Sequence, residues 1–165
     1  MQADDGVVLL RQLELSDVDT HLAGEDDDLV RWYNGGPGTR ATVEAHVRAA
    51  RAAWEAGGPT FTFGICTGDP AQLVGTVDAH LTLPSLRAGQ ANIAYGLYPS
   101  ARGRAWRREP SSWCATSSPA APRSSRRSSG STRANGASAA VALRAGFTLA
   151  RRGVDGELDR YVRNL

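Results

Sequence analysis

ANIAYGLYPSARGRA, residues 91–105, is the stretch that decides the fold. Its first part is typical of a strand, which Pro99 ends, so a strand is expected over 91–99. Arg102 and Gly103 follow at once, where a helix is expected to begin. The first N–H groups of a helix and the helix dipole attract an anion, and small residues let a phosphate approach that backbone. The stretch therefore predicts a strand that leads into a phosphate-binding loop.

On the N-terminal side of this stretch, the pattern predicts helices followed by strands. Apolar residues recur on one face of residues 39–58, which predicts a long helix that Thr39 or Thr42 caps and Gly57 ends. Acidic residues at 26–28 suit the N-terminus of another helical segment. The remaining predictions are a strand at 7–12, a short helix at 17–24, and strands at 60–67 and 73–83 that form a hairpin.

On the C-terminal side, regular patterns resume after residue 133. Residues 138–145 predict a short helix, and residues 147–153 with 157–164 predict a final hairpin. This order of strands and helices indicates a mixed sheet with helices, in the α/β or α+β class. A length of 165 residues suits one domain that spans residues 1–165.

Residues 105–133 interrupt these patterns. They contain no Val, Ile, Leu, Met or Phe and are rich in serine, arginine and proline. Such a composition is typical of disordered or linker segments, because burial cannot offset the ordering entropy. If the chain folds as written, we expect the helix after the phosphate loop and the strand that follows it to be compromised.

One hypothesis for residues 105–133 is a compensated double frameshift in the gene or in its reported sequence. Read one base earlier, tryptophan and cysteine codons encode Leu, Val or Met, and most serine codons encode Phe, Leu, Ile or Val. The shifted frame then gives an amphipathic helix over the segment. The alternative is a diverged Arg/Ser insertion, and a basic module that binds nucleic acid is a third reading.

Composition limits the remaining classes of function. The net charge of +2 is too small to imply a nucleic-acid partner by itself. No apolar stretch is long enough to span a membrane and no signal peptide is visible, so a cytoplasmic protein without a membrane partner is expected. Two cysteines, Cys66 and Cys114, are too few for a disulfide framework. Three histidines, at 21, 46 and 80, do not share metal-ligand spacing, so no metal site is expected and each is assigned to the surface or to packing.

A second stretch, ANGASAAVALRAGF at 134–147, combines Asn-x-x-Ser, a helix and a terminal Gly-Phe. Together with the Arg-Gly-x-Ala loop of 91–105, it resembles the GNAT superfamily of acetyl-CoA-dependent N-acetyltransferases. The segments LLRQLELSD and DDLVRWYN are similar to the branch that contains the ribosomal-protein N-terminal acetyltransferases. The resemblance covers nearly the whole chain and implies the acyl-CoA N-acyltransferase fold, a mixed central sheet flanked by helices.

The resemblance implies acetyl-CoA as cosubstrate. In the family the pantetheine arm lies beside the strand that precedes the phosphate loop, and a backbone N–H there polarises the thioester carbonyl. Carried over to this chain, the implied cofactor-binding residues are Leu97, Tyr98, Arg102, Gly103, Arg104, Ala105, Asn135 and Ser138.

The resemblance also implies direct attack by an amine on the thioester, without a metal or a nucleophilic cysteine. Asp78 and Tyr98 are the acid–base candidates, because their strands border the expected cleft. Ala142 stands where many relatives have a tyrosine acid, and Asn92 stands where this branch often has a glutamate. The expected activity is acetylation of a primary amine of a peptide or small molecule, by a monomer or homodimer. The alternative is a catalytically impaired protein of the same fold that binds CoA weakly or not at all.

Overall fold

The computed structural model describes residues 2–4, 7–84, 86, 90–103, 126–131, 140, 142–143, 147–152 and 159–164. They form two compact units. The first contains residues 1–78 and 95–106, and the second contains residues 79–94 and 107–165. The predicted helix after the phosphate loop lies outside the described residues.

Strands of the first unit form an antiparallel series. Strand β1 (Gln2–Asp4) pairs with β2 (Val8–Arg11), and β2 pairs with β3 (Thr60–Thr67). Next to β3 runs β4 (Gln72–His80), and β5 (Gln90–Leu97) follows in the order of the sheet. The strand predicted at 60–67 is confirmed, and those predicted at 7–12 and 91–99 are confirmed to within two residues at each end. The strand predicted at 73–83 ends earlier, at His80.

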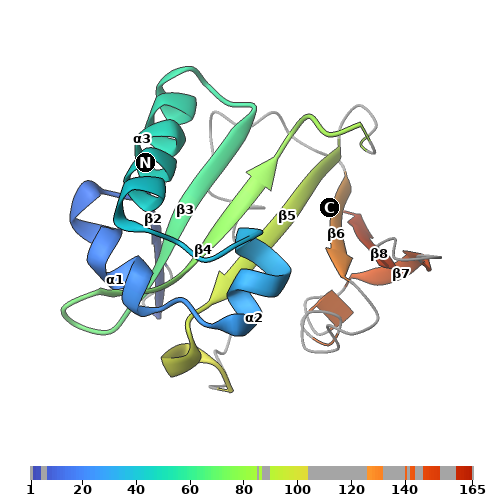
Figure 1. Cartoon of the computed structure of the whole chain (residues 1–165). Helices are drawn as coiled ribbons and strands as arrows, with labels where there is room; N and C mark the ends of the chain where they lie inside the picture. Colours follow the sequence, from blue (N-terminus) through green and yellow to red (C-terminus); the bar gives the residue numbers. More distant parts are fainter. Residues whose placement is uncertain are drawn as a thin grey trace. The chain divides into compact units, whose positions relative to one another are not determined.

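The helices of the first unit follow β2 and precede β3. A turn of 3-10 helix, η1 (Leu15–Asp17), leads into α1 (Val18–Ala23), and α2 (Asp27–Leu29) leads into the π-helical turn η2 (Val30–Asn34). The long helix α3 (Arg40–Glu55) packs against β3 (Figure 1). Both candidate caps of α3 are used, because Thr39 accepts a hydrogen bond from Thr42 N–H and the Thr42 side chain accepts one from Thr39 N–H.

Apolar side chains from these helices and strands form the core of the first unit. Val43, Val47 and Ala50 are buried on one face of α3, as the periodicity predicted. Trp54 is half-buried, donates from Nε1 to the Thr62 carbonyl oxygen (2.8 Å) and packs edge-on against neighbouring rings. Two of these α3 residues belong to a larger cluster of buried side chains from the helices, the strands and the loops between them. Its members are Leu13, Val18, Leu29, Val43, Val47, Cys66, Leu73 and Tyr98.

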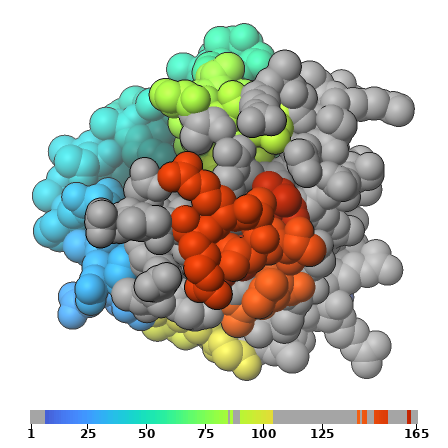
Figure 2. Space-filling view, turned by 90° about the vertical axis from the view of Figure 1, so that its right-hand side faces the viewer, coloured from blue at the N-terminus to red at the C-terminus, as the bar shows by residue number. Residues whose placement is uncertain are grey.

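The second unit contains the only parallel strand pair among the described residues. Strand β6 (Arg126–Ser131) pairs in parallel with β5 over Gln90–Asn92 and Arg126–Ser128. The β6 strand also pairs antiparallel with β8 (Asp159–Asn164), which pairs with β7 (Thr148–Arg151). The predicted mixed sheet and final hairpin are therefore confirmed. Figure 2 shows the face of this unit on which β7 is exposed.

Strand β6 departs from the expectation for residues 105–133. The composition predicted a compromised strand here, yet residues 126–131 form a ladder with two neighbours. Backbone N–H and C=O groups make such a ladder whatever the side chains are, so the lack of apolar residues does not prevent it. Residues 104–125 lie outside the described part of the chain, together with most of the helix predicted at 138–145.

Candidate active site

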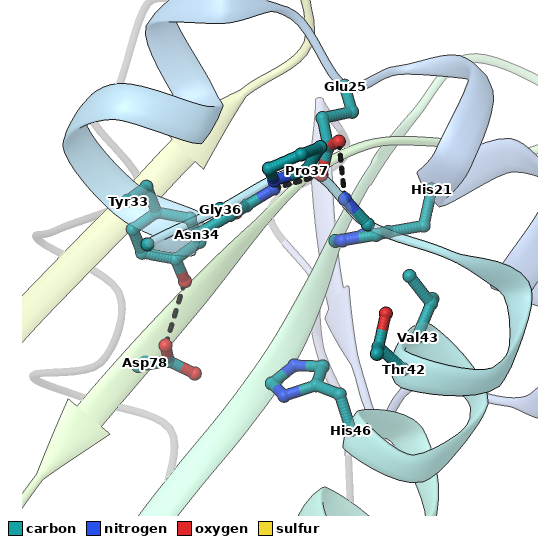
Figure 3. Close-up of a pocket in the computed structure, with 12 residues that line it drawn as sticks. His21, Glu25, Tyr33, Asn34, Gly36, Pro37, Thr42, Val43, His46 and Asp78 are labelled. Carbon is teal, nitrogen blue, oxygen red and sulfur yellow. Dashed lines mark hydrogen bonds between the residues drawn. The ribbon is translucent and has the colours of Figure 1, made fainter.

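A cavity of about 390 Å³ opens between the helices and β4 of the first unit (Figure 3). His21 comes from α1, His46 from α3 and Asp78 from β4, and Figure 3 shows these side chains at one cavity. The full lining is His21, Glu25, Tyr33, Asn34, Gly35, Gly36, Pro37, Gly38, Thr42, Val43, His46 and Asp78.

Asp78, one of the two acid–base candidates from the sequence, is fixed by two hydroxyl donors. Tyr33 Oη donates to Oδ2 at 2.8 Å, and Thr62 Oγ1 donates to Oδ1 at 2.5 Å. Tyr33 lies in the π-helical turn η2, a type of turn that is frequent at functional sites. Burial and the nearby Asp78 charge raise the pKa of Tyr33 well above its ordinary value, so this phenol stays a donor at neutral pH.

Glu25 holds the opposite wall of the cavity in place. Its Oε2 accepts from Asn34 Nδ2 at 2.6 Å, and its Oε1 accepts from Gly38 N–H at 2.7 Å. The loop from Asn34 to Gly38 begins at Gly35, which ends η2 in a left-handed conformation (φ 73°). One carboxylate therefore fixes both ends of the loop that forms this wall.

His21 connects the cavity with the end of β5. Its Nδ1 lies 2.9 Å from Tyr98 Oη, and the two rings meet edge to face at 5.8 Å between centroids. The centroid of the His46 ring lies 6.4 Å from that of His21. Burial and, second, the neighbouring His46 lower the pKa of His21 below its ordinary value. His21 is therefore a neutral imidazole at pH 7.

This buried neutral histidine predicts how stability depends on pH. The unfolded chain binds a proton at His21 near the ordinary pKa of about 6.5, but the folded chain binds it only at lower pH. The free energy of unfolding should fall as the pH drops below about 6.5 toward the folded pKa. His21→Gln should flatten this decline in urea unfolding followed from pH 7.5 to pH 5, and His46→Gln should flatten it in part. An unchanged slope in His21→Gln would contradict the assignment.

Tyr98, the other acid–base candidate, is buried at the end of β5, with its hydroxyl on His21. Desolvation raises the pKa of this phenol well above its ordinary value, so Tyr98 keeps its proton at neutral pH. Its backbone N–H donates to the Val74 carbonyl oxygen on β4 at 2.9 Å. In this structure β4 therefore uses the Tyr98 N–H.

Leu97 presents its backbone in the other direction. Peptide groups alternate in direction along an extended strand, so the N–H and C=O of Leu97 point away from β4 when Tyr98 N–H points toward it. The Leu97 carbonyl oxygen accepts from Arg102 Nε at 2.9 Å. The Leu97 N–H therefore points to the edge of β5 that faces away from β4.

Arg102 has partners that the sequence did not predict. Its guanidinium makes a two-pronged contact with Asp26, at 2.6 Å to Oδ2 and 2.9 Å to Oδ1, and Asp28 lies 3.5 Å away. The hydrogen bond from Arg102 holds the pKa of Asp26 below its ordinary value. The charge that was expected to meet a phosphate is directed to a carboxylate in this structure.

Gly103 follows the turn η3 (Pro99–Ala101) and adopts a left-handed conformation (φ 71°). Among the described residues, a Cβ placed there would meet no heavy atom within 4 Å, so no described atom blocks a close approach to this backbone. Both features suit the predicted phosphate loop. The other predicted cofactor-binding residues lie outside the described part of the chain and are Arg104, Ala105, Asn135 and Ser138.

Other sequence expectations concern absences and departures. Among the described residues, no group of three or more His, Cys, Asp or Glu side chains could hold a metal ion. In the same ranges, no helix combines the length and apolar character that crossing a membrane requires. Asn92 lies on β5, and Ala142 is buried beside Phe147 and Tyr161.

Sequence reasoning missed most of the cavity. The sequence assigns His21 and His46 to the surface or to packing, because their spacing matches no ligand motif. It contains no pattern that marks Glu25 as a site residue. In the sequence, the run of Gly35, Gly36 and Gly38 predicts only the end of the preceding helical segment. A possible signal was this glycine-rich run directly after an aromatic and polar helical turn.

Comparison with known proteins agrees with this architecture. The model of the acetyltransferase (GNAT) domain matches residues 8–148. RimL, a ribosomal L7/L12 alpha-N-protein acetyltransferase, is 19% identical with a TM-score of 0.79 over 100% of this chain and 94% of that chain. An acetyl transferase from Salmonella typhimurium, described as modifying the N-terminal serine of ribosomal protein L7/L12, is 19% identical with a TM-score of 0.77 over 98% and 96%.

A third similar structure is the microcin C7 self-immunity acetyltransferase MccE in complex with acetyl-CoA and AMP. It is 13% identical, with a TM-score of 0.78 over 98% of this chain and 94% of that chain. No curated protein matches the chain significantly. Because the family model spans most of its length, the chain belongs to the GNAT acetyltransferases, acyltransferases whose cosubstrate is acetyl-CoA.

Proposed function

We propose that this chain acetylates a primary amine of a peptide or small molecule, and that the amine binds in the cavity beside Asp78. The observation that carries the proposal is the hydrogen bond between His21, which lines the cavity, and Tyr98, which follows Leu97 in the chain. That bond links the cavity to the strand end where the thioester is expected.

The charge of the cavity supports an amine as the acceptor. Asp78 and Glu25 both line it, and an ammonium group is drawn toward carboxylates in a partly enclosed site. The hydrogen bonds from Tyr33 and Thr62 leave lone pairs on the Asp78 carboxylate for a further donor. The ammonium must lose a proton before it can attack, and Asp78 is the group we assign to receive that proton, with solvent removing it afterwards.

The backbone at the end of β5 supplies the electrophilic contact. We assign Leu97 N–H as the donor to the thioester carbonyl oxygen, where negative charge develops as the amine nitrogen attacks. The new C–N bond forms while the C–S bond breaks, so the products are an amide and the CoA thiol. Acetyl-CoA brings the activated acetyl group, and Gly103 offers the open backbone that a phosphate can approach.

Tyr98 is the group we assign to return a proton to the departing thiolate. The phenol is protonated at neutral pH, which is the state that an acid requires. Its hydrogen bond to His21 provides a route for replacing the proton from the cavity side.

A single N-acetyltransferase domain over residues 1–165 is part of the same proposal. The family model runs from residue 8 to residue 148 and so includes described strands of both compact units. That continuity supports one domain with segment 105–133 inside it.

The test is release of free CoA thiol from acetyl-CoA with a panel of amines. The panel should contain a peptide with an N-terminal serine, an aminoglycoside and a polyamine. The peptide is included because the L7/L12 acetyltransferase that resembles this chain is described as modifying an N-terminal serine. We expect amine-dependent thiol release that saturates with acetyl-CoA. Binding of acetyl-CoA in calorimetry without turnover of any amine would favour the impaired protein, and absence of binding would contradict the proposal.

A further inference from the structure

Arg102 makes three kinds of contact that together join two parts of the first unit. Its Nε donates to the Leu97 carbonyl oxygen, and its two terminal nitrogens donate to the two oxygens of Asp26. Asp28 adds a longer ionic contact at 3.5 Å. A planar guanidinium can make all these contacts at once, whereas the ammonium of a lysine cannot reproduce them.

On the strand side, these contacts fix the peptide group between Leu97 and Tyr98. Its carbonyl oxygen accepts from Arg102, and its N–H donates to Val74 on β4. The group is thus held from both edges of β5. The Leu97 N–H that we assign to the thioester precedes this fixed group by one peptide, so its direction depends on the same anchor.

On the helix side, Asp26 is the first residue of a continuous path to the cavity. Its Oδ1 caps α2 by accepting from Leu29 N–H at 3.0 Å. Helix α2 runs directly into η2, where Tyr33 contacts Asp78 and Asn34 contacts Glu25. We call residues 27–38 the acceptor segment, because they continue from α2 through η2 to the cavity wall.

We propose that Arg102 is a positioning residue that couples the cofactor loop, residues 99–103, to the acceptor segment, so that CoA binding orders the cavity wall. The inference rests on the proposed function for the identity of the two sites. Bound CoA would restrain the cofactor loop and Arg102 with it, and the pair with Asp26 would pass that restraint to the start of α2. The cavity is then most ordered when the cosubstrate is in place.

The test is amide hydrogen exchange in the acceptor segment with and without saturating coenzyme A. In the wild type, CoA should slow exchange in residues 27–38. Each variant is measured at a CoA concentration that calorimetry shows to be saturating for that variant. Under these conditions Arg102→Gln and Asp26→Asn should each remove the CoA-dependent slowing, and the double variant should remove no more than either alone. Asparagine remains a good N-cap, so Asp26→Asn breaks the ion pair without removing the cap of α2.

Arg11→Lys is the matched control. Arg11 makes a similar two-pronged pair with Asp17, at 2.7 Å for each contact, but neither residue belongs to the cofactor loop or the acceptor segment. This variant should keep the CoA-dependent slowing. The inference is overturned if the wild type binds CoA without slowing, or if Arg102→Gln and Asp26→Asn keep it. If the wild type binds no CoA in calorimetry, the proposed function fails and the inference fails with it.

Discussion

Replacing Asp78 with asparagine should lower kcat/KM for the amine by about 100-fold. The substitution removes the negative charge that attracts the ammonium and the group assigned to receive its proton. Tyr33 and Thr62 still offer hydroxyl groups to the side chain, so the local fold should persist. The measurement is the initial rate of thiol release at subsaturating amine, with the free energy of unfolding determined for the same variant.

Asp19→Asn is the matched control for this charge removal. Asp19 lies on α1, and its exposed side chain pairs with Arg40 at the surface. Surface pairs of this kind contribute little to stability, and Asp19 does not line the cavity. The control should keep kcat/KM within about twofold, since surface substitutions away from the cavity and the core usually have effects within about 0.5 kcal/mol. An Asp78→Asn enzyme as active as this control would remove Asp78 from the mechanism.

Replacing Gly75 with alanine should destabilise the fold by about 3 kcal/mol. A Cβ at this position of β4 would lie 2.3 Å from the Gly96 carbonyl oxygen and 3.0 Å from Leu97 Cα. Both atoms belong to the backbone of β5, so no side-chain rotation relieves the clash. The strands must move apart, which also displaces the Leu97 N–H assigned to the thioester.

Urea unfolding measures this effect, and Gly36→Ala is its control. A Cβ on Gly36 would meet no heavy atom of the described residues within 4 Å, so Gly36→Ala should change the free energy of unfolding by less than about 0.5 kcal/mol. If Gly75→Ala were as stable as the control, the close approach of β4 and β5 at this point would be contradicted.

Local patterns in the sequence predicted most of the elements of the first unit. TFTFGICT matches β3 residue for residue, because a run of β-formers is bounded by glycine and proline on both sides. The sequence offered Thr39 and Thr42 as candidate N-terminal caps of α3. In the structure Thr39 is the N-cap, and each threonine side chain accepts a hydrogen bond from the backbone N–H of the other. Signals of this kind lie within a few neighbouring residues, which is why one sequence contains them.

The candidate site was less predictable, because its contacts join distant parts of the chain. The partner of Arg102 is Asp26, 76 positions earlier, and the partner of Tyr33 is Asp78, 45 positions later. Charge alone assigned Arg102 to a phosphate, but the packing of α2 against the strand end brings a carboxylate to it. Which N–H of β5 faces the thioester depends on the register with β4, and the sequence of a single strand does not contain that register.

The most direct test of the account is a structure of the chain with acetyl-CoA bound, in which the distance from the thioester carbonyl oxygen to Leu97 N is measured. We expect Leu97 N–H to donate a hydrogen bond of about 3 Å to the thioester carbonyl oxygen, with the acetyl group directed to the cavity that Asp78 lines. A thioester carbonyl oxygen that lies beyond hydrogen-bond distance of Leu97 N, or an acetyl group directed away from that cavity, would contradict it.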